Sequence, residues 1–422
     1  MKPLDAVFKA YDVRGTVPDQ LDAEMCRAIG FAFARFSDTP RVLVARDMRA
    51  SGEELSAAFA DGARAAGASV VDLGLASTDL MYFAAGTLDA PGAMFTASHN
   101  PAGYNGIKMC LAGARPIGQD TGLGAIRAGA EEANASGDAA GVPAGSIESM
   151  SLLDEYAKHV RSFVDFAALR PLTVVADTAN GMGGLVAPAV FGPLALEVEY
   201  LYLELDGSFP NHPADPIQPE NLVDLKAAVL DHRADIGLAF DGDADRVFLV
   251  DERAEPVSGS LTTALVASAM LRSHPGATVL YNLICSKVVP ETILEMGGTP
   301  VRTRVGHSFI KEVMADTGAV FGGEHSGHYY FRDNYRADSG EINTEVPDPA
   351  GAVEAVAAEM AAAGASCDRT DGLTAEFDDW WFNLRPSNTE PLLRLNVEAR
   401  TEEQCALRVA EVVALVEHAS GK

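Results

Sequence analysis

The fold is indicated most directly by residues 93–101, whose sequence is Ala-Met-Phe-Thr-Ala-Ser-His-Asn-Pro. The apolar run 93–95 is typical of a buried strand, and the Gly-containing stretch 100–106 after it is typical of a loop. In open α/β sheets, ligands bind at the carboxyl ends of the strands, where loops carry the reactive side chains. Ser98 and His99 therefore stand where an α/β protein places its functional groups. A Ser-His pair on its own is more often an ordinary part of a polar loop than a reactive pair.

Apolar runs that end in polar loops recur in blocks of three along the chain, with helical segments between them. A capping box at 51–54 predicts the start of a helix over 55–66, and 129–145 is expected to form a loop. The pattern predicts three related α/β domains with mixed sheets. The strand-like runs lie at 41–47, 69–75 and 93–98, then at 172–177, 196–203 and 236–241, and finally at 278–282, 300–305 and 319–324.

A fourth unit follows the three blocks and predicts a smaller α+β domain. Its expected strands are 380–384 and 392–399, and the sequence 401–404 opens a last helix. The predicted domain boundaries are 1–148, 149–254, 255–340 and 341–422.

Three aspartates at alternate positions, Asp241, Asp243 and Asp245, form a loop between two apolar strand-like runs. Carboxylates this close repel one another, so a loop holds them together most readily around a cation. Oxygen ligands of this kind suit Mg²⁺ or Ca²⁺ and do not suit zinc or copper. An EF-hand is excluded even though Glu252 falls at the twelfth position, because Arg246 stands where that motif requires glycine.

Two further loops carry clustered polar groups. The stretch 322–328, Gly-Gly-Glu-His-Ser-Gly-His, offers donors and acceptors suited to sugar hydroxyls. Zinc is the competing interpretation for its two histidines, but their spacing without cysteine matches metal sites poorly. The stretch 385–391, Arg-Pro-Ser-Asn-Thr-Glu-Pro, combines a guanidinium group with two hydroxyls and an amide, which suits a phosphate.

Bulk composition narrows the class of protein. The 422 residues are 48% hydrophobic and 22% charged, with no apolar span long enough for a membrane and no signal peptide. Five scattered cysteines predict reduced thiols and a cytoplasmic location. The net charge of −28 argues against nucleic acid and anionic membranes as partners. An anionic substrate would then need local cations, for which the candidates are Arg14, Lys108, Arg246, Arg385 and Arg394.

Taken together and in this order, the four loops resemble those of the α-D-phosphohexomutase family, in its bacterial phosphomannomutase/phosphoglucomutase branch. The resemblance runs from 8–15, Phe-Lys-Ala-Tyr-Asp-Val-Arg-Gly, to the C-terminal helix. Asn388 and the His-Ser-Gly-His sequence favour this branch, since phosphoglucosamine mutases usually carry Gln in the sugar loop and Gly at the position of Asn388. The family arranges four domains around a central cleft, and each domain supplies one loop.

The resemblance implies a reversible transfer of phosphate between O1 and O6 of hexose phosphates. Phosphorylated Ser98 would be the donor and a hexose 1,6-bisphosphate the intermediate and activator, with one Mg²⁺ per chain. The partners would be small hexose phosphates, and the chain would be a monomer or a homodimer. The resemblance assigns catalysis to Ser98, Arg14, His99, Lys108, Arg246 and His307, metal binding to Ser98, Asp241, Asp243 and Asp245, and substrate binding to Tyr11, Glu324, Ser326, His328, Arg385, Ser387, Asn388 and Thr389.

Three candidates for the proton acceptor stay open, namely Lys108, His99 and His307. The chain also departs from the family pattern, because a helical stretch expected after Gly340 is missing and 341–345 follows at once. Ile284 replaces a basic residue common in relatives, and Lys287 is a candidate substitute. The alternatives are a phosphoglucosamine mutase, a catalytically impaired phosphosugar-binding protein and a metal-dependent phosphatase.

Overall fold

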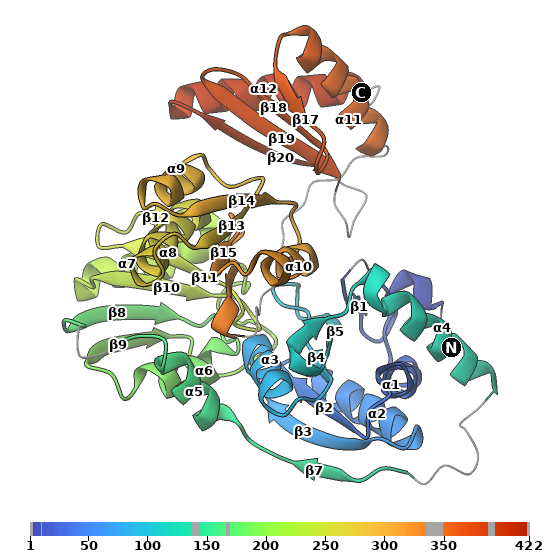
Figure 1. The fold of residues 1–422 in the computed structure, drawn as a ribbon. Helices are drawn as coiled ribbons and strands as arrows, with labels where there is room; N and C mark the ends of the chain where they lie inside the picture. Colours follow the sequence, from blue (N-terminus) through green and yellow to red (C-terminus); the bar gives the residue numbers. More distant parts are fainter. Residues whose placement is uncertain are drawn as a thin grey trace. The chain divides into compact units, whose positions relative to one another are not determined.

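The structure is a computed structural model that describes residues 3–9, 11–136, 144–165, 169–334, 349–386 and 393–419. The chain divides into two compact units. The first comprises Met1–Ser258 with Gly327–Ser339, and the second comprises Gly259–Ser326 with Gly340–Lys422. The predicted fold class of α/β mixed-sheet domains with a smaller C-terminal α+β domain is confirmed (Figure 1).

The first sheet has the order β1-β5-β4-β2-β3-β7, with β6 beside β5. Strands β2, β3, β4 and β7 are parallel, while β5 runs antiparallel to β1, β4 and β6. Its strands are β1 (Val13–Thr16), β2 (Arg41–Arg46), β3 (Ser69–Leu75), β4 (Gly92–Phe95), β5 (Tyr104–Leu111), β6 (Arg115–Pro116) and β7 (Ile147–Ser149).

Helices cover both faces of this sheet (Figure 1). Alternate side chains of β2 explain the two layers, because Val42 and Val44 join one core cluster while Leu43 and Ala45 join another. The first cluster includes residues of α1 (Ala23–Ser37), α2 (Gly52–Ala65) and α4 (Leu123–Ser136), and the second includes residues of α3 (Thr78–Thr87) and α5 (Leu153–Arg161). The short 3-10 helices η1 (Leu4–Ala6), η2 (Ala112–Ala114) and η3 (Gln119–Thr121) belong to the same domain.

The second sheet, also in the first unit, has the order β12-β11-β10-β8-β9. Strand β8 is parallel to β9 and β10, and β10 turns back antiparallel into β11, so the aspartate loop joins these two strands. Its elements are β8 (Leu172–Asp177), α6 (Gly183–Phe191), β9 (Leu196–Leu201), η5 (Pro219–Leu222), α7 (Val223–His232), β10 (Ile236–Phe240), β11 (Val247–Asp251) and β12 (Pro256–Val257). The first unit also contains β16 (Tyr329–Phe331) and η6 (Arg332–Asn334).

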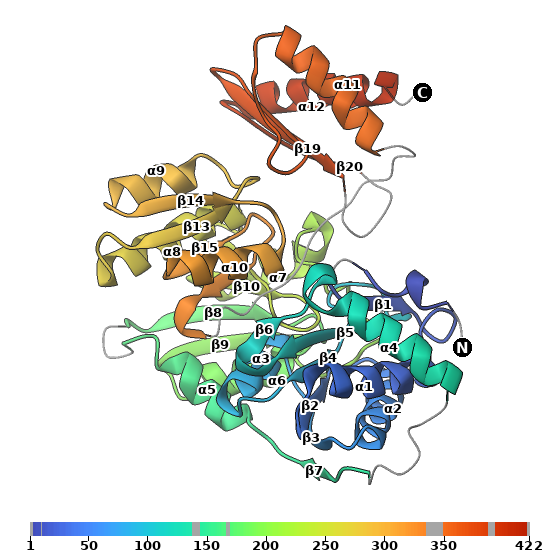
Figure 2. The ribbon, with the colours of Figure 1, turned by 45° about the vertical axis from the view of Figure 1, so that its right-hand side comes forward.

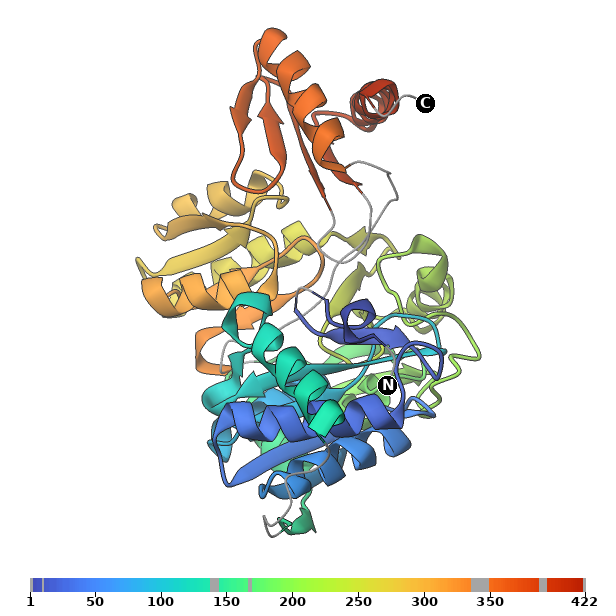
Figure 3. The same ribbon diagram turned by 90° about the vertical axis from the view of Figure 1, so that its right-hand side faces the viewer.

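In the second unit, β13 lies between β14 and β15 and pairs in parallel with both. The elements of this part are α8 (Gly259–Ser273), β13 (Thr278–Asn282), α9 (Val288–Glu295), β14 (Thr299–Thr303), α10 (His307–Thr317) and β15 (Phe321–Gly323). The C-terminal part is an antiparallel sheet in the order β17-β18-β19-β20, with α11 and α12 on one face (Figures 2 and 3). Its elements are α11 (Pro349–Ala362), β17 (Ser366–Asp368), β18 (Leu373–Glu376), β19 (Trp380–Pro386), β20 (Leu393–Ala399) and α12 (Glu402–Ala419).

The expectation of a loop over 129–145 is wrong in its first half, because α4 continues to Ser136. Alanines support the helix, and Gly129 lets it come close to α1. A Cβ atom at Gly129 would lie 3.2 Å from the Cβ of Ala32, while the neighbouring Ala130 is fully buried. Close packing therefore overrides the loop-like composition of this stretch.

The predicted capping box at 51–54 is also wrong, although α2 begins there. The Ser51 hydroxyl forms no bond to a helix amide and instead accepts a hydrogen bond from Asn105 Nδ2 at 3.0 Å. The last helix behaves as expected, since Thr401 Oγ1 accepts a hydrogen bond from the Gln404 amide at 3.2 Å. All five cysteines are free thiols.

Candidate active site

Ser98 lies in the loop that follows β4, and its hydroxyl is buried. The hydroxyl donates to Asp241 Oδ2 at 2.8 Å and accepts from Arg246 Nη2 at 3.1 Å. The backbone of Ser98 has φ +48°, a left-handed conformation that costs a residue other than glycine about 1–3 kcal/mol. Its amide is held by Thr96 Oγ1 at 2.9 Å. The strained backbone of Ser98 thus places its hydroxyl against the Asp241 carboxylate and the Arg246 guanidinium group.

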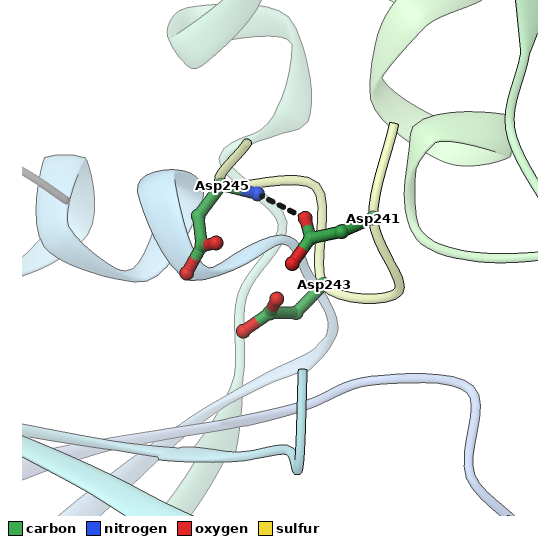
Figure 4. Close-up of side chains that lie close together, drawn as sticks. All are labelled: Asp241, Asp243 and Asp245. Carbon is green, nitrogen blue, oxygen red and sulfur yellow. Dashed lines mark hydrogen bonds between the residues drawn. The ribbon is translucent and has the colours of Figure 1, made fainter. Parts of the chain in front are cut away.

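The three aspartates of the loop between β10 and β11 converge (Figure 4). Each offers a carboxylate oxygen, and these oxygens all lie within 4.8 Å of one another. The amides of Asp245 and Arg246 both donate to Asp241 Oδ1 at 3.2 Å, which folds the loop around that carboxylate. Asp241 and Asp243 are fully buried. A metal site of oxygen ligands, as predicted from the spacing, is the chemistry that this donor set fits.

Two cations balance the three carboxylates. Lys108 Nζ, from β5, lies 2.8 Å from Asp243 Oδ2 and 2.6 Å from Asp245 Oδ2. Arg246 Nε donates to Asp241 Oδ2 at 2.9 Å. Burial works against charging each group, but the two aspartates raise the pKa of Lys108, and Lys108 lowers the pKa of Asp243. Burial and repulsion from Asp243 raise the pKa of Asp245.

The residues present fit a divalent cation. With all five groups ionised, three carboxylates and two cations leave a formal charge of −1. Two carboxylate oxygens, Asp243 Oδ1 and Asp245 Oδ1, are buried and have no hydrogen-bond partner. Buried acceptors without a partner are costly, so a cation bound here would satisfy both.

His99 and Arg14 complete the surroundings of Ser98. His99 Nδ1 contacts Arg246 Nη2 and lies 3.4 Å from Ser98 Oγ. Burial, followed by repulsion from Arg246 and Arg14, lowers the pKa of His99 well below its usual value, so its imidazole is neutral. Arg14, from β1, donates to Asn100 Oδ1 at 2.7 Å, which connects it to the Ser98 loop. Tyr11 lies two residues before the start of β1 and is half-buried.

The predicted sugar loop is divided between the two units. In the second unit, Glu324 is buried, and its Oε1 accepts hydrogen bonds from Asn282 Nδ2 at 2.7 Å and the Gly306 amide at 3.4 Å. Ser326 is buried in the same unit, whereas the buried His328 belongs to the first unit.

Part of the predicted phosphate loop lies outside what the structure describes. Arg385 is buried at the end of β19 and pairs in register with Arg394 of β20. Ser387, Asn388 and Thr389 fall outside the described residues, as does the side chain of His307, whose backbone begins α10. The predicted deletion after Gly340 also falls on a stretch that the structure does not describe.

Four consecutive parts of the sequence match the domains of one family, phosphoglucomutase/phosphomannomutase. Residues 5–135, 154–255 and 258–345 match its alpha/beta/alpha domains I, II and III, and 341–415 match its C-terminal domain. The chain belongs to this family. The resemblance that the four loops indicated is therefore confirmed.

Relatives match the chain over nearly its whole length. A protein of Xanthomonas campestris named as phosphohexose mutases is 40% identical, over 93% of this chain and 95% of that protein. The phosphomannomutase/phosphoglucomutase of Pseudomonas aeruginosa is 35% identical, over 94% and 93%. Among solved structures, a phosphoglucomutase/phosphomannomutase family protein of Burkholderia thailandensis superimposes with a TM-score of 0.88 at 32% identity, covering 99% of this chain and 98% of that one.

The alignment with the relative from Xanthomonas contains positions that have no residue in this chain. The alignment spans 427 positions, whereas 93% of the 422 residues amounts to about 392, so about 35 positions have no counterpart here. The matches to domain III and to the C-terminal domain also overlap, because one ends at 345 and the other begins at 341. Among the described residues, no helix is long and apolar enough to cross a membrane.

Sequence reasoning missed two residues that hold the Ser98 loop and the aspartate loop. Thr78, the first residue of α3, donates from its hydroxyl to Asp243 Oδ2 at 2.7 Å and from its amide to the Asp243 carbonyl at 3.1 Å. Arg49 follows β2 and contacts the Ser98 loop. A Ser-Thr-Asp helix start and an Asp-x-Arg after a strand are visible in the sequence. Neither pattern says which distant loop the residue will touch.

Proposed function

We propose that the chain is a phosphomannomutase/phosphoglucomutase that moves a phosphoryl group reversibly between O1 and O6 of hexose phosphates. The observation that carries this proposal is the Ser98 hydroxyl, which is held by Asp241 and Arg246 at the edge of the aspartate cluster. Relatives at 35–40% identity that are named for these activities support it. Phosphorylated Ser98 would give its phosphoryl group to a substrate hydroxyl, forming a hexose 1,6-bisphosphate that later returns its other phosphate.

Arg246 has the position to stabilise the charge that moves in this transfer. When the bond between phosphorus and Ser98 Oγ breaks, negative charge returns to Oγ, to which Arg246 Nη2 already donates. Arg246 Nη1 is buried without a hydrogen-bond partner, so a second donor is available for a phosphoryl oxygen. Fixed donors aimed at the reacting oxygens are the main protein contribution to phosphoryl transfer.

The substrate hydroxyl must lose a proton as it attacks. Lys108 is held as an ammonium group by two carboxylates, and an ammonium group cannot accept a proton. His99 is neutral, and because its Nδ1 accepts from the Arg246 guanidinium group, the ring proton lies on Nε2 and the lone pair of Nδ1 is already engaged. His99 could take the proton only at Nδ1, once Arg246 Nη2 turns to the phosphoryl group, and we propose His99 in that role with His307 as the other remaining candidate.

Asp241, Asp243 and Asp245, with an oxygen of phosphorylated Ser98, would hold one Mg²⁺ per chain. The ion would act as a Lewis acid on the phosphoryl oxygens. Thr78 orients Asp243 for this task, since both its hydroxyl and its amide bind that residue.

The remaining loops would bind the sugar phosphate. Tyr11, Glu324, Ser326 and His328 would contact hydroxyls, and Arg385 with 387–389 would hold the phosphate that is not reacting. An amino sugar substrate is not favoured, because relatives at 35–38% identity over most of the chain are named phosphomannomutase or phosphomannomutase/phosphoglucomutase. The free cysteines support the proposal of a cytoplasmic location.

The test is ³¹P NMR of the purified chain with Mg²⁺, a trace of hexose 1,6-bisphosphate, and either mannose 1-phosphate or glucose 1-phosphate. Growth of a 6-phosphate signal is expected in both, and glucosamine 1-phosphate serves as the comparison substrate. Release of inorganic phosphate instead would indicate a phosphatase. No conversion by a folded sample would contradict the proposal and favour a phosphosugar-binding protein.

Ser98→Ala is the matched variant for this test. Loss of the phosphoryl carrier should abolish nearly all conversion, while the affinity for the sugar phosphate stays within about tenfold, because the hydroxyl itself carries little binding energy. Calorimetric titration with the substrate measures the affinity. Wild-type turnover by this variant would exclude a phosphoserine mechanism.

A further inference from the structure

Arg49 is an arginine that is only 2% exposed, in the loop after β2. A guanidinium group has five N–H donors, and here all five are used. Four donate to backbone carbonyl groups of the Ser98 loop, and the fifth donates to the neighbouring carboxylate. The bonds are Nη2 to the carbonyls of Ser98 (2.9 Å) and Asn100 (2.6 Å), Nη1 to those of Pro101 (2.8 Å) and Tyr104 (3.0 Å), and Nε to Asp47 Oδ2 (3.2 Å).

The charge of Arg49 is matched locally. Asp47 is fully buried, and its second carboxylate oxygen accepts the Arg49 amide at 2.9 Å. Asp47 thus fixes both the backbone and the side chain of Arg49. The Asp47 carboxylate compensates the buried charge of the guanidinium group, whose remaining N–H donors are directed at the Ser98 loop.

A face of the Arg49 guanidinium group is covered by a loop that follows β9 in the second sheet. The Phe209 ring lies 5.2 Å from the guanidinium carbon. A Cβ atom at Gly207 would lie 2.6 Å from the Arg49 Cα, so this close approach requires glycine. Arg49 therefore lies between the Ser98 loop and a loop of the domain that carries the aspartates.

The carbonyl group of Ser98 links the contacts of Arg49 to the candidate active site. It accepts from Arg49 and also faces Gly242, where an added Cβ would lie 2.4 Å from it. The left-handed backbone of Ser98 can persist only if its surroundings determine it. The four bonds from Arg49 to backbone carbonyl groups of residues 98–104 supply such a constraint on the carbonyl side of Ser98.

We propose that Arg49 is a positioning residue that holds the 98–104 loop so that the Ser98 hydroxyl faces Asp241 and Arg246. Its part in phosphoryl transfer rests on the function proposed above, whereas its hold on the loop does not. Lysine cannot replace it, because one ammonium group has three donors at a single point and cannot reach four carbonyl groups. Arg49 touches no reacting atom, so its loss should affect turnover more than substrate affinity.

The test compares Arg49→Lys with Arg64→Lys. Arg64 is a matched control because its Nε also binds a backbone carbonyl, that of Gly145, at 2.9 Å. Arg49→Lys is expected to lower kcat about 100-fold, the effect of misplacing a reacting group by about 1 Å, with KM within about threefold. Arg64→Lys should leave both constants unchanged. A kcat for Arg49→Lys within about twofold of the wild-type value would overturn the proposal.

Hydrogen exchange of the amides in 98–104 tests the hold on the loop without reference to activity. Arg49→Lys should exchange at least about tenfold faster there, with the sheet amides unchanged. If the wild type converts no hexose phosphate, the function proposed above fails, while this measurement still decides the role of Arg49 in the loop. Unchanged exchange would overturn that role.

If Arg49→Lys does not fold, Phe209→Leu takes its place. This variant keeps an apolar side chain but removes the ring that covers the guanidinium group. It is expected to speed exchange in 98–104 by about threefold, in line with the loss of a cation–π contact. Wild-type exchange in Phe209→Leu would then overturn the proposal.

Discussion

Replacing Lys108 with methionine should separate the stability of the aspartate cluster from its chemistry. Lys108 Nζ lies within 2.8 Å of oxygens of both Asp243 and Asp245, and its side chain is 8% exposed. Removing one partner of a buried ion pair leaves an uncompensated charge, which costs about 3–5 kcal/mol. The formal charge of the cluster changes from −1 to −2. For a domain of 150–250 residues, this penalty corresponds to a fall in Tm of about 6–20 °C.

Mg²⁺ should reverse part of this loss, because a divalent ion supplies the positive charge that the variant lacks. By linkage, Lys108→Met should therefore bind Mg²⁺ at least tenfold more tightly than the wild type. A tenfold difference in affinity corresponds to about 1.4 kcal/mol of the penalty, which the bound ion would offset. Thermal unfolding followed by circular dichroism, with EDTA and with saturating Mg²⁺, measures both effects. Turnover should fall, since Asp243 and Asp245 lose the cation that both contact and that offsets their mutual repulsion.

Lys158→Met is the control, because Lys158 is an exposed residue of α5 and its loss should change stability by no more than about 0.5 kcal/mol. Two results would refute the reasoning. One is an unchanged Tm of Lys108→Met in EDTA. The other is weaker Mg²⁺ binding by the variant, which would mean that Lys108 builds the metal site instead of competing with the ion.

Two further predictions concern Thr78, which orients Asp243, and His212, which follows β9 in the same unit. Thr78→Val keeps the shape of the side chain but removes the hydroxyl that orients Asp243. The affinity for Mg²⁺, measured by calorimetric titration, should therefore fall about 10- to 100-fold. An unchanged affinity would contradict this role of Thr78. Burial lowers the pKa of His212, but its hydrogen bond to Asp177 at 3.0 Å prevails and raises it above 6.5. The free energy of unfolding of the wild type, measured with urea, should therefore exceed that of His212→Gln most below about pH 6.5. The difference should shrink as the pH rises through the raised pKa of His212. A difference that grows with pH would contradict this prediction.

Chemistry that is contiguous in the sequence could be predicted from it. The strand–loop–strand pattern around 241–246 predicts both the sheet position and the ligand type, because three carboxylates at alternate positions of one loop repel one another unless a cation binds them. The pattern at 93–101 likewise places Ser98 beyond the end of a strand. In each case the functional groups and the structural signals lie within ten residues of one another.

Contacts between distant segments could not be predicted in this way. Arg49 meets the Ser98 loop because β2 and β4 are parallel neighbours, so the segments that follow both strands leave the sheet at the same edge. The sequence predicts the strands without predicting which of them pair. The capping box failed for a related reason, since the Ser51 hydroxyl binds Asn105, which lies far away in the chain.

The charge arrangement explains how so acidic a chain can handle an anionic group. The net charge of −28 is that of the whole chain, but around Ser98 two cations are buried against three carboxylates, with a formal sum of −1. Phosphorylation of Ser98 would add about −1.5 to −2, and a divalent cation would add a nearly equal positive charge. If both arrive together, the local charge hardly changes, whereas either alone would leave a buried imbalance that is costly in a poorly solvated site. Because of the aspartates, binding of the metal ion and phosphorylation of Ser98 each favour the other. The bound metal ion therefore offsets part of the repulsion between the acidic chain and the phosphoryl group, and local arginine and lysine side chains do not have to offset all of it.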